Sequence, residues 1–335
     1  MALTIRDVAR AAGVSTATVS RALRGLDNVD PATRDRVVRI AREMKFSVSP
    51  SASRLATGRT GSIAIVTPFL GGWYFTELFA GMEAALQRFD VDLLLHATGM
   101  PGVTAHPLRA HERVRRRVDG VLVLGMPLEM VESEGLFELD VPVVLLGLQA
   151  PGVPSVSIDD RLAARMAVEH LVERGHKRIG LISGRPLPTM FVPENDRLAG
   201  YLEVLVEHGL SVDETLREPG DFKVAGGEQA MERLLSLRPG PTAVFAMSDE
   251  MAYGALRAMR RRGVEPGKDI AIIGFDGHDL ADTFDLSTVR QPVRDLGKAA
   301  GELLMERIAA GSLADAEVAP ILLPTQLYAR GSTGC

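Results

Sequence analysis

Apolar residues recur every three to four positions in the first 46 residues, and their spacing changes further along the chain. This pattern predicts three short helices, over about 5–12, 16–24 and 31–44. Each predicted helix follows a residue whose side chain can cap it, namely Thr4, Ser15 or Asp30. Gly13 separates the first two helices, because a tight turn there requires a positive φ. A small helical module is therefore expected at the start of the chain.

From residue 61 onward, short apolar runs alternate with helix-like stretches. Strand-like runs lie at 63–66, 91–95, 121–124, 143–146, 179–182, 243–246 and 270–275. Examples of the helix-like stretches between them are 75–89, 162–174, 197–207, 228–237 and 251–262. Strands that are apolar on both faces predict parallel sheets covered by helices on both sides. About 270 residues of this pattern exceed one regular sheet, so two similar lobes are expected.

Charge divides the chain in the same way. Residues 1–60 hold eleven Lys and Arg against five Asp and Glu, a net charge of +6, although the whole chain carries −5. A basic head on an acidic body is typical of a protein that binds nucleic acid through the head alone.

Three features predict a cytoplasmic location. The one cysteine, Cys335, can form no internal disulfide, which favours a reducing compartment. No apolar run reaches the length of a membrane span, and the first residues lack the pattern of a secretion signal.

Residues 7–23 have the pattern of a helix-turn-helix. The second helix would enter the major groove with its outward-facing residues, Thr16, Ala17, Ser20 and Arg21. Arg21 can bind guanine through two parallel hydrogen bonds, and Thr16 and Ala17 can contact thymine methyl groups or base edges. A generic helical pair with a solvated basic face is the alternative.

Four runs carry a family resemblance: TIRDVA at 4–9, GVSxxTVSR at 13–21, VDPATR at 29–34 and SIAIV at 62–66. In these runs the chain resembles the head and hinge of the LacI/GalR family of bacterial repressors, and the body resembles that family's sensor domain. The resemblance implies an α/β fold: a three-helix helix-turn-helix head and a two-lobed, periplasmic-binding-protein-like sensor of doubly wound parallel sheets.

This resemblance also implies domain limits. The DNA-binding domain is expected at 1–46, a hinge linker with a short helix at 47–60, and a ligand-binding and dimerisation domain at 61–335. Within the last, lobe 1 is expected at about 61–158 and 292–320, and lobe 2 at about 159–291 and 321–330.

For DNA binding, the resemblance implies a homodimer whose two heads sit on a pseudo-palindromic operator, with Thr16, Ala17 and Arg21 setting operator preference. Leu55 of the hinge matches the leucine that wedges into the minor groove, and Ala52 and Ser53 match neighbouring contact positions. A wedge of this kind opens a base step and bends the duplex, which then offers more contacts. A buried linker residue is the alternative reading of Leu55.

Ligand sensing is expected at the carboxyl ends of the strands, where open parallel sheets bind ligands. Trp73, Tyr74 and Phe75 follow the first core strand, and aromatic faces stack on sugar rings or bases. Of these three residues, the resemblance implies that Tyr74 and Phe75 are best placed to line the ligand cleft.

Arg197 and Asp276 match the family's ligand-binding arginine and aspartate. Such a pair can clamp a diol through charge-assisted hydrogen bonds, and a structural ion pair is the alternative. Phe222 and Ser248 match further pocket positions, and Gln291 lies on an expected crossover between the lobes.

The expected function is that of a repressor. Catalysis is not expected, because the histidines lack the spacing of metal ligands and no nucleophile motif is present. A small effector, with a sugar favoured, is expected to release the operator, and neither cofactor nor metal is expected. A purine-like corepressor, a protein co-regulator and a sugar-binding receptor are the alternatives. A dimer is expected, because the end of the chain shows no leucine heptads that could join dimers into tetramers. Helices that begin near Glu77 and Met251 are expected to form the dimer interface.

Overall fold

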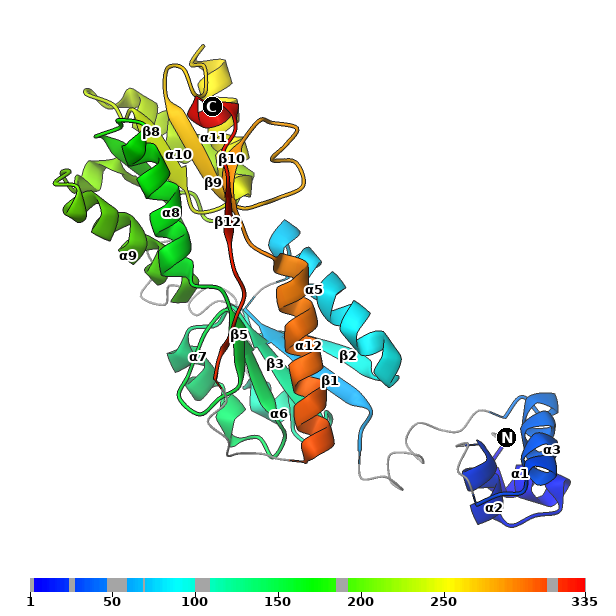
Figure 1. Ribbon diagram of the computed structural model, residues 1–335. Helices are drawn as coiled ribbons and strands as arrows, with labels where there is room; N and C mark the ends of the chain where they lie inside the picture. Colours follow the sequence, from blue (N-terminus) through cyan, green and yellow to red (C-terminus); the bar gives the residue numbers. More distant parts are fainter. Residues whose placement is uncertain are drawn as a thin grey trace. The chain divides into compact units, whose positions relative to one another are not determined.

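The computed structural model describes residues 3–23, 28–46, 59–68, 70–99, 109–184, 192–311 and 319–334. These residues form two compact units, Met1–Thr60 and Gly61–Cys335, which are described separately (Figure 1). The hinge residues Ala52, Ser53 and Leu55 lie outside the described residues.

The head consists of the three predicted helices, α1 (Ile5–Ala12), α2 (Thr16–Leu23) and α3 (Pro31–Glu43). Local side chains fix where they begin. The hydroxyl of Ser15 accepts the N–H of Thr18, and the carboxylate of Asp30 accepts the N–H of Thr33, both at 3.0 Å. Gly13 adopts φ +67°, which confirms the predicted turn. Buried side chains from all three helices, including Val8, Val19 and Val37, form one small core.

The first lobe of the body contains a six-stranded sheet in the order β11-β5-β4-β3-β1-β2, and every pairing in it is parallel. The strands are β1 (Ser62–Thr67), β2 (Asp92–Ala97), β3 (Gly120–Leu124), β4 (Val143–Leu146), β5 (Ser155–Ser157) and β11 (Ile321–Leu322). The helices are α5 (Trp73–Leu86), η1 (Gln87–Phe89), α6 (Ala110–Val114), α7 (Leu128–Ser133), η2 (Leu136–Glu138) and α12 (Val293–Ala310).

The second lobe repeats this plan with the strand order β12-β10-β9-β8-β6-β7, and only the pairing of β12 with β10 is antiparallel. Its strands are β6 (Ile179–Ser183), β7 (Arg217–Pro219), β8 (Ala243–Ala246), β9 (Ala271–Asp276), β10 (Ser287–Arg290) and β12 (Gln326–Tyr328). Its helices are α8 (Asp160–Glu173), α9 (Val192–Glu207), η3 (Glu214–Leu216), α10 (Val224–Ser236), α11 (Asp249–Arg261) and η4 (Gly331–Thr333).

Two predicted boundaries need correction. The helix expected from residue 197 begins at Val192, so Arg197 lies in its second turn. Residues 321–322, expected in lobe 2, form β11 and pair with β5 of the first sheet, so the chain leaves the first lobe only after Leu322. Five short strands were not predicted, because none of them contains an apolar run of four residues: β5, β7, β10, β11 and β12.

The chain therefore passes between the lobes three times, after β5, after β10 and after β11 (Figure 1). The first two crossings start from the carboxyl ends of parallel strands, which are the ends that bind ligands in open α/β sheets. The carboxyl ends of the parallel strands of the second sheet therefore lie beside the segments that connect it to the first lobe.

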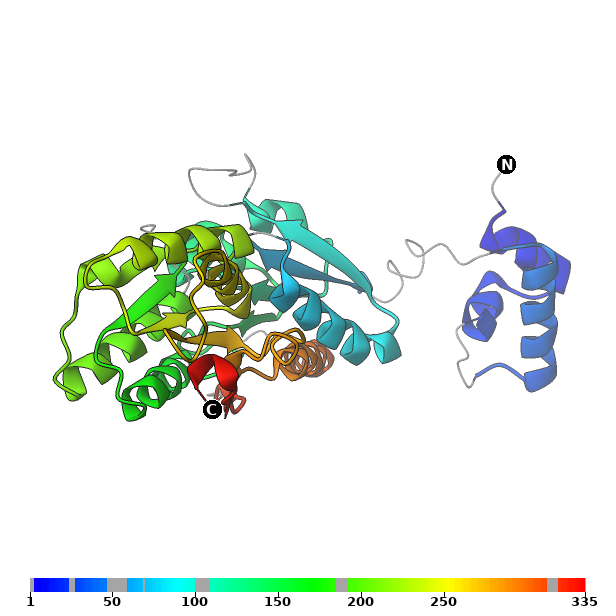
Figure 2. The ribbon, with the colours of Figure 1, turned by 90° about the horizontal axis from the view of Figure 1, so that it is seen from above.

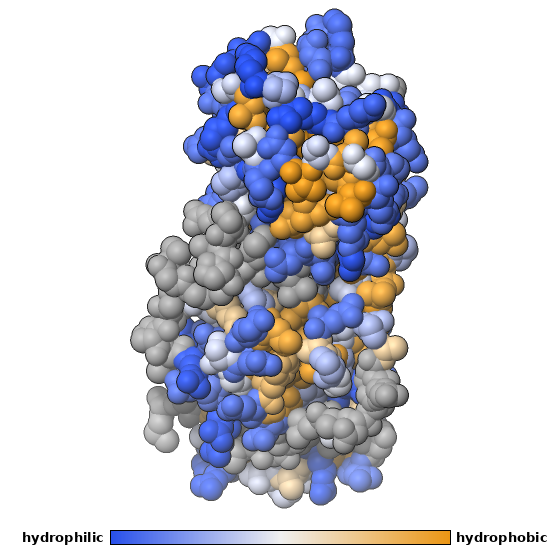
Figure 3. Space-filling model, turned by 90° about the vertical axis from the view of Figure 1, so that its left-hand side faces the viewer, coloured by the Kyte–Doolittle hydropathy of each residue, from blue (hydrophilic) through white to orange (hydrophobic). Residues whose placement is uncertain are grey.

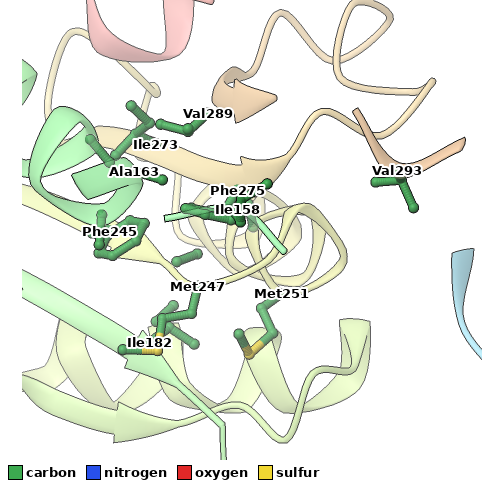
Figure 4. Packing of buried hydrophobic residues seen from close by; sticks show 14 of the residues in the cluster. Ile158, Ala163, Ile182, Phe245, Met247, Met251, Ile273, Phe275, Val289 and Val293 are labelled. Atoms are coloured by element: carbon green, nitrogen blue, oxygen red, sulfur yellow. The ribbon is translucent and has the colours of Figure 1, made fainter. Parts of the chain in front are cut away.

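Helices of the body pack in close pairs. Helices α5 and α12 lie side by side, where Gly81 and Gly297 each lie against the backbone of the other helix (Figure 2). The pair α10 and α11 meets at Gly254, and α11 also places Met251 in the core near Met247 and Ile182 (Figure 4).

On the surface, hydrophilic side chains cover much of the face shown in Figure 3, and apolar side chains are exposed in patches on both lobes. None of the described helices combines the length and apolar character that a bilayer crossing requires.

We expect Gly254→Ala to destabilise the body by about 1–3 kcal/mol, because a Cβ there would lie 1.9 Å from the Val224 carbonyl oxygen of α10. Ala is otherwise the better helix former, so the sign of the change is diagnostic. Urea denaturation followed by circular dichroism measures it. Gly240→Ala is the matched control, because its Cβ would meet only ordinary contacts. Equal stability of the two variants would contradict the close packing.

Candidate functional site

The outer face of α2 carries the predicted DNA-reading residues. Thr16, Ala17 and Arg21 are exposed and Ser20 is half-buried, whereas Val19 on the opposite side is fully buried. The packing of the head thus leaves these four side chains on one accessible face of its second helix.

Arg197 is the charged centre of the second lobe. Its side chain projects from α9 and is 6% exposed. Its Nε donates to Oδ1 of Asp160, and its Nη1 donates to the carbonyl of Met247, both at 2.7 Å. The guanidinium carbon lies 3.7 Å from the ring centre of Phe275, whose position in the core is shown in Figure 4. A charge-assisted hydrogen bond and a cation–π contact therefore fix the guanidinium.

Asp276 ends β9 in a backbone conformation that is rare for a residue with a side chain, φ +113°. Its Oδ1 accepts a hydrogen bond from Nε2 of Gln291 at 2.7 Å and lies 3.8 Å from Nη1 of Arg197. Because Asp160 follows the first crossing and Gln291 precedes α12, the series Asp160–Arg197–Asp276–Gln291 joins two of the segments that connect the lobes.

The acids outnumber the base at this edge. Burial raises the pKa of Asp160, although the neighbouring charge of Arg197 lowers it. Burial also raises the pKa of Asp276 to about 7, against the opposing effects of Arg197 and the Gln291 hydrogen bond. Glu194, one turn before Arg197 on α9, has a pKa raised by burial to about 7. The carboxylates of Asp160 and Asp276 thus lie within 4 Å of one guanidinium, whose charge also acts on Glu194.

The aromatic residues of α5 divide between two environments. Phe75 is buried in the body core, and its ring contacts those of Tyr74 and Phe79. Burial raises the pKa of Tyr74, and the charges of Asp160 and Asp276 raise it further, so this first-lobe hydroxyl lies within the electrostatic reach of the second-lobe acids.

Trp73, at the start of α5, connects the lobes directly. Its ring stacks on that of His278 with centroids 4.7 Å apart, and its Nε1 donates to Asp279 at 3.3 Å. The loop after β9 therefore contacts the first helix of the first lobe.

Phe222 and Ser248 follow β7 and β8, the two strands that flank β6 in the second sheet. Phe222 follows β7, is half-buried and has φ +51°. Ser248 follows β8, is buried, and its hydroxyl accepts the N–H of Met251, which caps α11.

The structure thus brings Arg197, Asp276 and Gln291 into one polar cluster whose charges act on Tyr74, with Phe222 and Ser248 on the same edge. Arg197 and Asp276 both belong to the second lobe, and the direct partner of Arg197 is Asp160. Asp160 and Glu194 are not among the site residues predicted from the sequence. Within the described residues, no group of three or more His, Cys, Asp or Glu side chains is arranged to hold a metal ion.

Two family models match the chain. That of the bacterial regulatory proteins of the lacI family matches residues 4–49, and that of the periplasmic binding protein-like domain matches residues 168–333. The chain is 36% identical over 341 residues to the HTH-type transcriptional repressor CytR of Escherichia coli strain K12, covering 99% of this chain and 96% of CytR. It is 35% identical over 345 residues to the HTH-type transcriptional regulator CelR of Thermobifida fusca, covering 98% of each.

Solved structures agree with these matches. The Lac repressor dimer bound to operator and the anti-inducer ONPF superposes with a TM-score of 0.87 at 26% identity, covering 99% of both chains. A CelR–cellobiose complex superposes with a TM-score of 0.71 at 32% identity, covering 98% of this chain and 99% of that chain.

A helix-turn-helix head joined to a two-lobed body with a polar cluster at its strand ends defines a DNA-binding transcriptional regulator that responds to a small molecule. The chain belongs to the LacI family of bacterial regulatory proteins.

We expect the free energy of unfolding of the body to decrease as the pH rises from about 4 to about 7, in part because of Asp276. Its pKa is raised from 3.8 to about 7, so the folded chain keeps a proton that the unfolded chain releases. The stability from this group is present at low pH and is lost as the pH rises through 7. Thermal unfolding of Asp276→Asn between pH 5 and 8 should therefore show a smaller decline than that of the unsubstituted chain.

Asp282→Asn is the control for this measurement, because the Asp282 side chain is 90% exposed. A decline of the same size in Asp276→Asn and in the unsubstituted chain would show that the Asp276 carboxylate is not the titrating group.

Proposed function

We propose that this regulator is a repressor that binds a pseudo-palindromic operator as a homodimer and releases it when a sugar binds the body. The observation that carries the proposal is the buried series Asp160–Arg197–Asp276–Gln291, which lies at the strand ends and also joins two of the lobe connections. A ligand bonded to this series would act on the segments that set the relation between the lobes.

For DNA binding, we propose that Thr16, Ala17, Ser20 and Arg21 contact the major groove. The exposed face of α2 supports this assignment. In the hinge, 47–60, Leu55 would wedge into the minor groove with Ala52 and Ser53 beside it. The support for the hinge contacts is the family resemblance alone.

A sugar is the proposed effector, because the relatives include a CelR–cellobiose complex and a lac repressor bound to ONPG. The chemistry of the edge supports it: buried carboxylates and a guanidinium accept from and donate to hydroxyl groups. We propose Tyr74 and Phe75 from the first lobe, and Arg197, Phe222, Ser248, Asp276 and Gln291 from the second, as the residues that form the site. Phe75 would act by supporting the ring of Tyr74.

The proposed dimer would use helices α5 and α11. Exposed apolar side chains support an interface at α11, where the ring of Phe284, itself 43% exposed, contacts that of Tyr253. Leu280, 45% exposed, lies four residues before Phe284. The relative solved on operator DNA is also a dimer.

The proposed role is binding rather than catalysis, since the relatives of this chain are transcriptional regulators. We place the protein in the cytoplasm, where a bacterial operator is accessible.

We expect Arg21→Ala to remove about 1–3 kcal/mol of discrimination between the operator and duplexes altered at the base that Arg21 contacts, because two parallel hydrogen bonds to guanine would be lost. Salt-sensitive binding to random DNA should remain. Fluorescence anisotropy with the operator and base-substituted duplexes measures both. Arg39→Ala, which removes an exposed charge from α3, is the control. Unchanged discrimination would remove Arg21 from the reading role.

We expect Asp276→Ala to weaken effector binding roughly ten- to hundredfold and to leave operator affinity intact, because charge-assisted hydrogen bonds to the ligand would be lost. A thermal-shift screen of sugars identifies an effector for the unsubstituted chain, and calorimetry compares the variant. Full effector affinity in the variant would place the site elsewhere, and a simultaneous loss of operator binding would indicate misfolding.

A further inference from the structure

One buried carboxylate at the strand ends has an oxygen with no partner. Glu194 is 2% exposed, and among the described residues its Oε1 accepts no hydrogen bond. The same carboxylate accepts the backbone N–H of Gly184, which holds it at the end of β6. A buried acceptor left unsatisfied destabilises the fold, and more so when it is charged, so we expect this oxygen to serve a function.

Glu194 belongs to the same edge as the polar cluster. It precedes Arg197 by three residues on α9, so both side chains lie on one face of the helix. The position that a Cβ on Gly184 would occupy is 2.4 Å from Cε2 of Phe222 and 2.5 Å from both oxygens of Glu194. The aromatic ring of Phe222 and the carboxylate are therefore immediate neighbours, and the absence of a side chain at Gly184 makes room for both.

The charge around Glu194 favours donors and opposes anions. Arg197 already donates to Asp160 and to the Met247 carbonyl, so it leaves Oε1 of Glu194 without a bond. Asp221, whose carboxylate pairs with Lys223 at 3.1 Å, also acts on Glu194. A phosphate or carboxylate at this edge would be repelled by the surplus of acids, whereas an N–H donor would complete the free oxygen and lie against the face of Phe222.

We propose that Glu194 determines the specificity of the effector site by accepting a hydrogen bond from a nitrogen of the ligand. The effector is then a small polar molecule with an amino group, uncharged or cationic, and it carries no phosphate or carboxylate. This inference rests on the proposed function, because it assumes that the effector binds at this edge of the second lobe.

The test compares ligands that differ by one amino group: glucosamine against glucose, cytidine against uridine, and adenosine against inosine, with glucose 6-phosphate as the anionic probe. Isothermal calorimetry on the full chain without DNA measures each affinity. In at least one pair the amino member should bind roughly ten- to hundredfold more tightly, the range of a hydrogen bond to a charged group. Equal or tighter binding of the other members, or tightest binding of the phosphate, would overturn the proposal.

Glu194→Gln separates specificity from structure, because it removes the charge and keeps the size. In Glu194→Gln the two members of a pair should bind with about equal affinity. The preference for the amino member should persist in Asp196→Asn, which changes the neighbouring acid on the same helix. A preference that survives Glu194→Gln would assign recognition to another residue.

A measurement without ligand decides the case if no probe binds. Because Oε1 is unsatisfied, Glu194→Gln should melt at the same temperature as the unsubstituted chain at pH 8, or higher. A lower melting temperature would show that the charge of Glu194 is already compensated within the protein, and would overturn the proposal. Operator binding is assayed separately. Its absence alongside an intact amino preference would count against the repressor function and not against the role of Glu194.

Discussion

The burial of one guanidinium organises the body of this regulator. An ion removed from water must be met by opposite charge and by hydrogen bonds, or it destabilises the fold by several kcal/mol. Arg197 meets this condition through Asp160, the Met247 carbonyl and the ring of Phe275. These partners come from the first crossing between the lobes, from the end of β8 and from β9. The requirement to satisfy one side chain thus fixes three separate segments against one another at the edge where ligands bind in such sheets.

In the proposed site, the same cluster would give the effector a means of control. Asp276 is tied to Gln291, which precedes the helix that returns to the first lobe, and Asp276 itself sits at a strained φ. A ligand that took over part of this hydrogen bonding would change the contacts that hold the lobe connections. Allosteric coupling of about 1–3 kcal/mol requires only a difference in bonding of this size between the two states.

Local rules in the sequence were sufficient for the head. Its helix starts depend on Ser15, Asp30 and Gly13, whose effects reach only three or four residues, and the structure confirms them. Long apolar strands such as β1 and β9 were equally clear. Short strands that lack a continuous apolar run, such as β11 and β10, give no clear signal in the sequence and are defined by their pairing partners.

The site was predictable only in part, because its contacts are not local. Asp160 lies 37 residues from Arg197 and has the sequence features of a helix start, so nothing nearby marks it as the arginine's partner. Glu194 lies before the point where the pattern placed the helix, and its burial follows from the packing of Gly184 and Phe222 against it. Proximity of this kind emerges only when the second lobe is folded.

The third passage of the chain, from β11 to β12, limits how the sensor can move. Two lobes joined by a single linker can move apart freely, but here three segments of the chain connect the lobes. Three connections resist a wide separation of the lobes and permit a small rotation of one lobe relative to the other. We therefore expect a motion between the lobes to change their angle more than their distance.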